Sequence, residues 1–290
     1  MYLLLVNPTS GGGKGKSQGQ IVRDYLARHS LDFIEISGSS YESAASALAH
    51  AIRKTSHLEA LIVVGGDGMA HLAIQELAKS SIPLILIPAG TGNDFARSLG
   101  LPLSDPISIL ERSRKNSATA IDLGTVNGRY FCEVLSTGFD SVVNERANRM
   151  RLISGRSKYN LAILLELPLF RPRRYAFAVD GASFEVDAML IAIANGASYG
   201  GGMRVCPDAK LDDGRFDLMI LEPVSKLEFL RVFPRVFSGS HIDHPRVRIM
   251  RGSKVEVEAH AVAYADGERI GQLPITAEIA PSALRTWRFP

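Results

Sequence analysis

Two glycine-rich loops, each built around a carboxylate, are the strongest chemical signals in the sequence. Gly65-Gly66-Asp67-Gly68 and the segment PAGTGNDFAR at 88–97 each follow a short apolar run, which is typical of a buried strand. Glycines let the backbone approach a ligand closely, and the N–H groups at the start of a helix attract an anion. The alternative for both loops is a tight turn in which an aspartate caps a helix. If the loops bind a ligand, Asp67 would hold Mg²⁺, and the second loop adds a hydroxyl, an amide and a carboxylate from Thr91, Asn93 and Asp94.

A third loop, residues 7–16, follows the first apolar run of the chain. It is rich in glycine and carries Lys14 and Lys16, so it could cradle phosphates. Gly15-Lys16-Ser17 matches the end of a Walker A P-loop, but Ser10 stands where that motif requires glycine. The alternative is a flexible, solvated loop.

The elements that must position these loops alternate between strand and helix over residues 1–120. Ligands of a doubly wound sheet bind at the carboxyl ends of its strands, where all three loops lie. The alternation predicts an α/β lobe of this kind, with a parallel sheet. Apolar runs predict strands at Tyr2–Val6, 31–36, 60–64 and 82–87, and helix-spaced apolar residues predict helices at 20–29, Tyr41–Lys54 and 69–79.

The remaining residues, 121–290, predict a β-rich second domain, whose last residues are candidates for returning to the first lobe. Asn127-Gly128, Asp180-Gly181 and Asp266-Gly267 are two-residue turns typical of antiparallel hairpins. A helical insertion is expected near residues 144–170. Short strands are expected at 120–123, 129–135, 175–179, 182–187, 189–194, 215–221, 254–259 and 261–265.

Composition narrows the class of protein. The chain has 290 residues, of which 46% are hydrophobic, so it can bury a large core and is not wholly disordered. Its net charge of +3 is too small to indicate nucleic-acid binding. Cys132 and Cys206 make neither a disulfide framework nor a zinc site, and we expect both to be buried. No apolar run approaches the ~18 residues of a membrane span, and the short apolar start is not a signal peptide. We expect a cytoplasmic protein without stable transmembrane anchoring.

Taken together, the motifs resemble those of the soluble bacterial lipid kinase family, related to diacylglycerol and sphingosine kinases. The resemblance implies an ATP-binding α/β lobe and a lipid-binding β-sandwich lobe, with ATP and Mg²⁺ in the cleft between them. The matching stretches occur in order over nearly the whole chain: Asn7–Gly11, Gly65–Gly68, Pro88–Phe95, Asn195-Gly196 with Gly200-Gly201-Gly202, Pro207–Leu218 and Asp266-Gly267-Glu268.

The resemblance also implies roles for single residues. Asp67 is expected to organise the catalytic Mg²⁺, Glu268 to act as the general base for the lipid hydroxyl, and Asp266 to support Glu268. A second Mg²⁺ is expected on the Asp213 carboxylate and the carbonyls of Lys210 and Arg215, although Asp212-Asp213-Gly214 alone is only a hairpin turn. With the loop residues above, the expected nucleotide-binding set is Asn7, Pro8, Thr9, Ser10, Gly11, Gly65, Gly66, Asp67, Gly68, Thr91, Asn93 and Asp94.

One position departs from the family pattern. Met69 stands where the family usually has threonine, so a hydroxyl near the phosphates is missing, and His71 is a candidate to replace a polar contact. Two other functions stay open, and Met69 supports only the second of them. One is another kinase of the same Gly-Gly-Asp-Gly superfamily, such as an NAD kinase with a soluble acceptor. The other is a catalytically weak nucleotide- or lipid-binding regulator.

A basic cluster brackets the apolar stretch 161–170. Eight cations against the single acid Glu166 give a local charge of +7. Cations beside an apolar segment favour docking on an anionic membrane, whereas the alternative is a solvated face over an ordinary core helix. The expected partner is a lipid substrate at the membrane surface, met through transient peripheral association, with a homodimer as a further candidate. The cations are Arg146, Arg149, Arg151, Arg156, Lys158, Arg171, Arg173 and Arg174.

Overall fold

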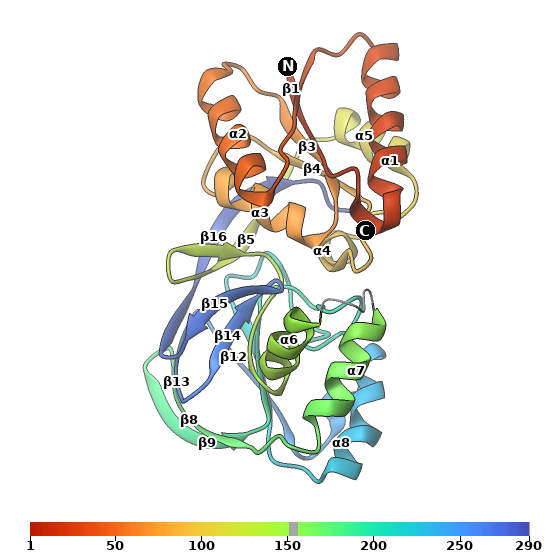
Figure 1. The fold of residues 1–290 in the computed structure, drawn as a ribbon. Coiled ribbons are helices and arrows are strands. Elements are labelled where there is room, and N and C mark those ends of the chain that lie inside the picture. The colour runs from red at the N-terminus through yellow and green to blue at the C-terminus, as the bar shows by residue number, and fades with distance from the viewer. Residues whose placement is uncertain (151–155, 290) are drawn as a thin grey trace. The chain divides into compact units, whose positions relative to one another are not determined.

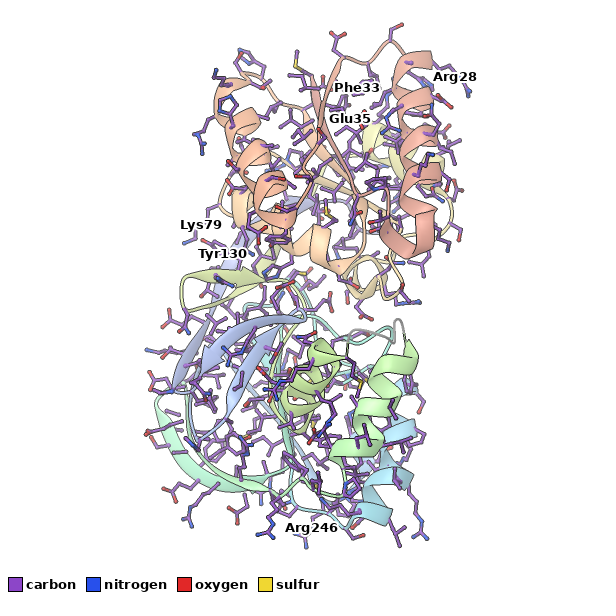
Figure 2. All side chains as sticks on the ribbon, in the orientation of Figure 1. Arg28, Phe33, Glu35, Lys79, Tyr130 and Arg246 are labelled. Atoms are coloured by element: carbon purple, nitrogen blue, oxygen red, sulfur yellow. The ribbon has the colours of Figure 1, made fainter. Side chains whose placement is uncertain are left out.

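The structure is a computed structural model that describes residues 1–150 and 156–289, without the side chains of residues 156–160. The chain divides into two compact units. The first unit contains Met1–Leu123 and Ala280–Pro290, and the second contains Gly124–Ile279 (Figure 1). Side chains fill the interior of each unit (Figure 2).

A parallel sheet forms the centre of the first unit. Its strands follow the order β2 (Phe33–Ile36), β1 (Tyr2–Val6), β3 (Ala60–Gly65) and β4 (Leu84–Pro88), and every neighbouring pair is parallel. All residues of β3 and β4 are buried, which explains why both sequences are continuous apolar runs rather than alternating ones.

Helices cover both faces of this sheet, which confirms the predicted doubly wound α/β lobe. Helices α1 (Ser10–Arg28) and α5 (Pro106–Lys115) pack together on one face, and α2 (Tyr41–Lys54) and α3 (Asp67–Leu77) on the other (Figure 1). The short helix α4 (Asp94–Ser98) follows β4. The loops before α1, α3 and α4 therefore all begin at the carboxyl ends of strands.

Helix α1 begins earlier than the predicted range 20–29. After an irregular stretch at Gly11–Gly13, the backbone is helical from Lys14 onward. Glycine disfavours a helix, but Gly15 and Gly19 are needed here because α1 lies directly on β1. A Cβ at Gly15 would overlap the Asn7 carbonyl, and one at Gly19 would lie 2.8 Å from a methyl group of Val6.

The end of the chain supplies a further strand to the first unit. Strand β16 (Ile275–Thr286) ends parallel to β4, where the Thr286 hydroxyl donates to the Leu84 carbonyl at 2.8 Å. The Asp122 carboxylate accepts the N–H of Ser282 at 2.7 Å. These contacts hold the last residues of β16 against the parallel sheet.

Two sheets form a β-sandwich in the second unit, as the resemblance implied. Side chains from both sheets, such as Phe177 and Ile191, share one core. The first sheet has the order β12 (Val247–Gly252), β11 (Phe216–Leu221), β10 (Leu190–Ala194), β7 (Val134–Gly138), β14 (Val262–Ala265) and β15 (Glu268–Gln272). The second contains β9 (Ala182–Ala188), β8 (Arg173–Val179), β13 (Lys254–Glu258) and the start of β16, with β5 (Thr119–Val126) and β6 (Arg129–Phe131) attached.

Helices cover the other face of the six-stranded sheet. Phe139 packs edge-to-face against Phe170 and Phe229, with ring centroids 5.3 and 5.0 Å apart. The predicted helical insertion is confirmed, but it starts at Phe139 instead of near residue 144. The layer consists of α6 (Phe139–Arg149), α7 (Arg156–Glu166) and α8 (Lys226–Val232), followed by 3₁₀ turns at Phe233–Phe237 and Ser240–Asp243.

The strand predictions for this unit are mixed. The three Asn-Gly and Asp-Gly turns join β5 to β6, β8 to β9 and β14 to β15, with positive φ at both residues of each turn. A single strand over 129–135 is wrong, because the N–H groups of residues 132–134 bond to the Asp266 carboxylate between β6 and β7. Strands β12 and β15 were not predicted, because they are polar or contain glycine, and β16, which contains a proline, was given no range.

Candidate active site

The three glycine-rich loops meet at the carboxyl edge of the parallel sheet. The Asn7 N–H donates to the Val64 carbonyl at 3.0 Å, and the Ala89 N–H donates to the Gly65 carbonyl at 2.7 Å. Each loop is thus tied to the end of β3, the strand that lies between β1 and β4. The sequence prediction that these loops share one edge is confirmed.

Close packing explains several of the glycines in these loops. A Cβ at Gly66 would lie 2.9 Å from the Gly90 Cα, and a Cβ at Gly11, which has a φ of +57°, would overlap the Ala89 carbonyl. A Cβ at Gly68 would meet nothing within 4 Å. Gly11 and Gly66 are therefore needed for the close contact between the loops. Packing does not explain Gly68, and the reason left for a glycine there is the space it gives to a ligand.

Asp67 connects two of the loops. It is the first residue of α3, whose N-cap is Gly66, and its carboxylate accepts the Phe95 N–H in α4 at 3.2 Å. Gly66, not Asp67, is therefore the N-cap residue of α3. A carboxylate at the N-terminus of one helix that also reaches the first turn of another is a hard oxygen donor suited to Mg²⁺.

Asn93 and its neighbours have different surroundings. Asn93 is buried in a left-handed conformation, and its amide group accepts the Gly90 N–H at 2.8 Å and donates to the Gly90 carbonyl at 2.9 Å. Asn93, not Asp94, is the N-cap of α4. Asp94 is also buried, while Thr91 is exposed. Asn93 thus closes the loop, and nucleotide contacts by these three residues stay a prediction.

In the first loop, Asn7 forms a local turn. Its side-chain oxygen accepts the N–H of Thr9 at 3.1 Å and the Thr9 hydroxyl at 2.9 Å. Pro8 and Thr9 are exposed, as are Lys14 and Lys16 at the start of the regular part of α1. Two exposed cations at the amino end of this helix favour a phosphate near the loop, and the predicted ATP contacts of Asn7–Gly11 remain untested.

Met69 lies over the end of β3. A Cβ on Gly65 would be 2.5 Å from the Met69 Cγ and 3.8 Å from the Ser10 hydroxyl. Met69 is half-buried in the first turn of α3. The side chain that departs from the family pattern therefore fills space beside Gly65 and faces the first loop. His71, by contrast, is buried.

In the second unit, the hairpin of β14 and β15 carries the other predicted catalytic residues. The Asp266 carboxylate accepts the N–H groups of Cys132, Glu133 and Val134 at 2.8, 2.9 and 3.3 Å, and the Cys132 thiol at 3.3 Å. Glu268 begins β15 and is exposed. Asp266 thus anchors the tip of the hairpin, while the Glu268 side chain faces solvent within this unit.

Sequence reasoning missed Glu133, which is buried beside this hairpin. Its backbone carbonyl accepts the N–H groups of Asn195 and Gly196 at 2.8 and 3.0 Å, and its side-chain carboxylate accepts the Ser198 N–H at 3.4 Å. A Cβ on Gly196 would overlap that carboxylate. Glu133 therefore joins the Asn195-Gly196 motif to the segment that holds Asp266. The available signal was a lone acid inside the apolar run FCEVL.

The predicted second magnesium loop has a competing cation. Asp213 accepts the Arg215 N–H at 3.2 Å and pairs with the Arg251 guanidinium, whose Nε also lies 3.3 Å from the Asp217 carboxylate. Asp217 and Arg251 lie opposite each other on β11 and β12. A metal ion at this loop would have to displace Arg251 from Asp213, so the residues as arranged do not fit it. The second magnesium stays a prediction from the resemblance.

Several cations of the predicted basic cluster have structural partners. Arg146 pairs with Glu166 of α7, and Arg149 lies 3.6 Å from Glu145. Arg174 pairs with Glu185, Arg173 donates to the His260 carbonyl, and Arg171 is exposed. Arg151 lies outside the described residues, as do the side chains of Arg156 and Lys158. Cys132 and Cys206 are buried, as predicted.

A doubly wound unit with three glycine loops at one edge, together with a β-sandwich unit, defines a class of two-domain kinases. Residues 1–126 match the diacylglycerol kinase catalytic domain, and residues 133–288 match the YegS C-terminal NAD kinase beta sandwich-like domain. The chain belongs to the bacterial diacylglycerol kinase family. It is therefore a lipid kinase, a phosphotransferase with an alcohol acceptor, and membership of a kinase family implies ATP as the phosphate donor.

Individual relatives are similar to this chain over nearly its whole length. A diacylglycerol kinase of Mycobacterium tuberculosis is 40% identical, in an alignment that covers 98% of this chain and 94% of the relative. A diacylglycerol kinase of Bacillus subtilis is 31% identical, in an alignment that covers 93% of this chain and 90% of the relative. The crystal structure of a diacylglycerol kinase from Bacillus anthracis strain Sterne has the same fold, with a TM-score of 0.73 at 20% identity over 100% of this chain and 97% of that one. Within the described residues, no helix is long and apolar enough to cross a bilayer.

Proposed function

We propose that this protein transfers the γ-phosphate of ATP to the free hydroxyl of a membrane lipid such as diacylglycerol, with Mg²⁺ as cofactor. One observation carries the proposal most strongly: Asp67 lies among three glycine loops at the carboxyl edge of a parallel sheet. The diacylglycerol kinase names of relatives up to 40% identical support the acceptor.

The residues divide the chemistry between them. Asp67 would hold Mg²⁺, which supplies charge neutralisation on the phosphates, the main requirement of phosphoryl transfer. The loop N–H groups and the amino end of α3 would orient the nucleotide. Glu268 would take the proton from the lipid hydroxyl, and a well-placed general base contributes about 10²–10⁴ in rate. Asp266 is a poor substitute for that base, because both its oxygens already accept backbone N–H groups.

The first experiment identifies the acceptor. The protein is incubated with labelled ATP, Mg²⁺ and vesicles containing diacylglycerol, and in parallel with NAD in place of lipid. We expect label in the lipid, and label in NAD alone would favour the NAD-kinase alternative. Glu268→Gln should lower kcat at least ~10²-fold with little change in ATP affinity. Asp67→Ala should abolish activity and weaken Mg·ATP binding, whereas unchanged binding would leave Asp67 with only its structural contact to Phe95.

Transient membrane association is supported by a set of exposed leucines on the helical layer. We call it the leucine patch; its side chains are between 43% and 71% exposed. The segment after α7 is held to α8, because Phe139 packs on both Phe170 and Phe229, and the Lys226 ammonium group donates to the Phe170 carbonyl. The leucine patch consists of Leu164, Leu165, Leu169, Leu227 and Leu230.

A lipid bilayer with anionic headgroups is the partner that this surface fits. Apolar side chains could enter the acyl boundary while neighbouring cations, such as the exposed Arg171, remain at the headgroups. Within the stretch 161–170, Ala162, Leu167 and Phe170 belong to the core, whereas the leucines between them are exposed, and docking of those leucines on a membrane stays a prediction.

A second experiment tests this docking. Leu164→Ser with Leu169→Ser should weaken binding to anionic vesicles about tenfold or more, since each leucine removed from the membrane costs more than ~1 kcal/mol. Binding should also weaken with salt. Phosphorylation of a short, water-soluble diacylglycerol should be unaffected. Ile249→Ser, at an exposed apolar residue on β12, is the matched control and should change neither. Unchanged vesicle binding in the double variant would remove the leucine patch from the docking surface.

A further inference from the structure

Glu145 of α6 holds the hairpin that carries Glu268. One oxygen of the Glu145 carboxylate accepts both the Tyr264 hydroxyl at 3.0 Å and the Arg269 Nε at 2.7 Å. The other oxygen lies 3.6 Å from the Arg149 guanidinium. Tyr264 and Arg269 lie opposite each other on β14 and β15, so this one side chain contacts both strands of the hairpin.

The contacts are partly shielded from water. Tyr264 is buried, and burial together with the hydrogen bond to Glu145 raises its pKa to about 12. The bond from Arg269, the largest influence, lowers the pKa of Glu145. Glu145 therefore remains ionised at neutral pH, and its hydrogen bonds are charge-assisted, which makes them stronger than neutral ones.

The hairpin needs such a contact because its ladder is interrupted. Between Ala263 and Tyr264 the register shifts, so that Ala263 faces Gly271 while Tyr264 faces Arg269. A bulge of this kind disrupts the ladder locally and bends the strand. The hydrogen-bond ladder of β14 and β15 therefore holds the tip, from Tyr264 to Arg269, less firmly than an unbroken ladder would.

Glu268 lies between two anchored positions. On one side, Asp266 binds the backbone of residues 132–134. On the other, Arg269 is bound by Glu145. Since successive side chains of a strand point to opposite faces, Glu268 points away from the face on which Arg269 meets α6. The two anchors thus fix the backbone of Glu268 without occupying its carboxylate.

We infer that Glu145 is a positioning residue for phosphoryl transfer, which acts by fixing the hairpin tip so that Glu268 is presented in one orientation. The inference rests on the proposed role of Glu268 as general base. A displacement of about 1 Å can cost up to ~10²-fold in rate when it moves a reacting group. Glu145→Ala should therefore lower kcat about tenfold, while KM for ATP changes by less than about twofold.

The experiment combines Glu145→Ala with Glu268→Gln. If Glu145 acts through Glu268, the double variant should be no slower than Glu268→Gln alone. Amide hydrogen exchange at residues 264–269 should also become faster in Glu145→Ala, and Glu145→Gln, which keeps an acceptor for Tyr264, should lose less activity. If Glu145→Ala does not fold, Glu145→Gln is combined with Glu268→Gln instead, and the two variants are compared in the same way.

Glu222→Ala is the matched control. Glu222 is also a mostly buried carboxylate that pairs with two arginines, Arg246 and Arg248, and its position after β11 is far along the six-stranded sheet from β15. Its loss should leave kcat unchanged.

The outcomes separate this inference from the proposed function. A normal kcat in folded Glu145→Ala, an equal further loss in the Glu268→Gln background, or an equal loss in Glu222→Ala would each overturn the positioning role. Near-normal turnover of Glu268→Gln alone would instead refute the assignment of the base, whatever the exchange rates of the hairpin.

Discussion

Replacing Asp266 by alanine is expected to destabilise the second unit strongly. Its carboxylate accepts the N–H groups of Cys132, Glu133 and Val134 at 2.8, 2.9 and 3.3 Å. These three residues are buried. In the alanine variant, these buried donors lose their acceptor, and water could replace it only in the half-buried space that the Asp266 side chain leaves.

The expected magnitude follows from these contacts. A hydrogen bond to a charged group contributes about 1.5–3 kcal/mol, so two short bonds and one longer bond together amount to about 4–6 kcal/mol. Asp266 also has a φ of +50°. Aspartate and asparagine tolerate this conformation better than alanine does, which adds about 1 kcal/mol. Because domains are stable by only about 5–15 kcal/mol, the loss is a large part of the total.

Asp180 provides the matched control. It occupies the same position of the Asp-Gly turn between β8 and β9, with a φ of +48°, and accepts the N–H groups of Ser253 and Lys254 at 3.0 and 2.9 Å. These residues are exposed, so water can replace the carboxylate. Asp180→Ala should therefore cost only about 1–2 kcal/mol.

Urea unfolding followed by far-ultraviolet circular dichroism measures both effects. We expect Asp266→Ala to lose several times more free energy of unfolding than Asp180→Ala, and Asp266→Asn, which keeps one acceptor oxygen and the turn preference, to lie between wild type and Asp266→Ala. Equal losses in the two alanine variants would refute the reasoning, because burial of the donors would then not determine the cost.

Met69, Asp140 and Asp213 each give a further prediction. Met69→Thr should leave turnover unchanged or raise it and cost about 1 kcal/mol of packing beside Gly65; a large fall in kcat with the fold intact would give Met69 a role of its own. Burial raises the pKa of Asp140 from 3.8 to about 6. The folded state then binds this proton more tightly than the unfolded state, so the free energy of unfolding should fall by up to ~3 kcal/mol as pH rises from about 4 to about 6. Asp140→Asn should remove that slope in urea unfolding at pH values on either side of this range. Without nucleotide, Mg²⁺ should leave the midpoint of thermal unfolding within about 1 °C of its value in EDTA, because Arg251 already pairs with Asp213; a larger rise that disappears in Asp213→Asn would establish the second cation.

The first unit was largely predictable from sequence. Strands buried on both faces must be continuous apolar runs, so β1, β3 and β4 were recognisable, and the glycine loops after them marked the edge where the site lies. The Asp-Gly and Asn-Gly turns of the second unit were equally clear, because few residues adopt a positive φ without strain. Strand β15, with the sequence ERIGQ, had no comparable signal, because the contacts that hold it come from β14 and from Glu145 of α6 and leave no apolar pattern in its own sequence.

By itself, then, the sequence determined the alternating elements of the first unit, the β-rich character of the second, the shared edge of the three loops and the residues that resemble a kinase site. The tertiary structure alone decided what several of these residues do. Gly66 is needed against Gly90, Asp266 is an anchor rather than a free carboxylate, and Glu145 reaches a hairpin more than a hundred residues away. These roles depend on contacts between residues distant in the chain, and local spacing and composition carry no information about such contacts.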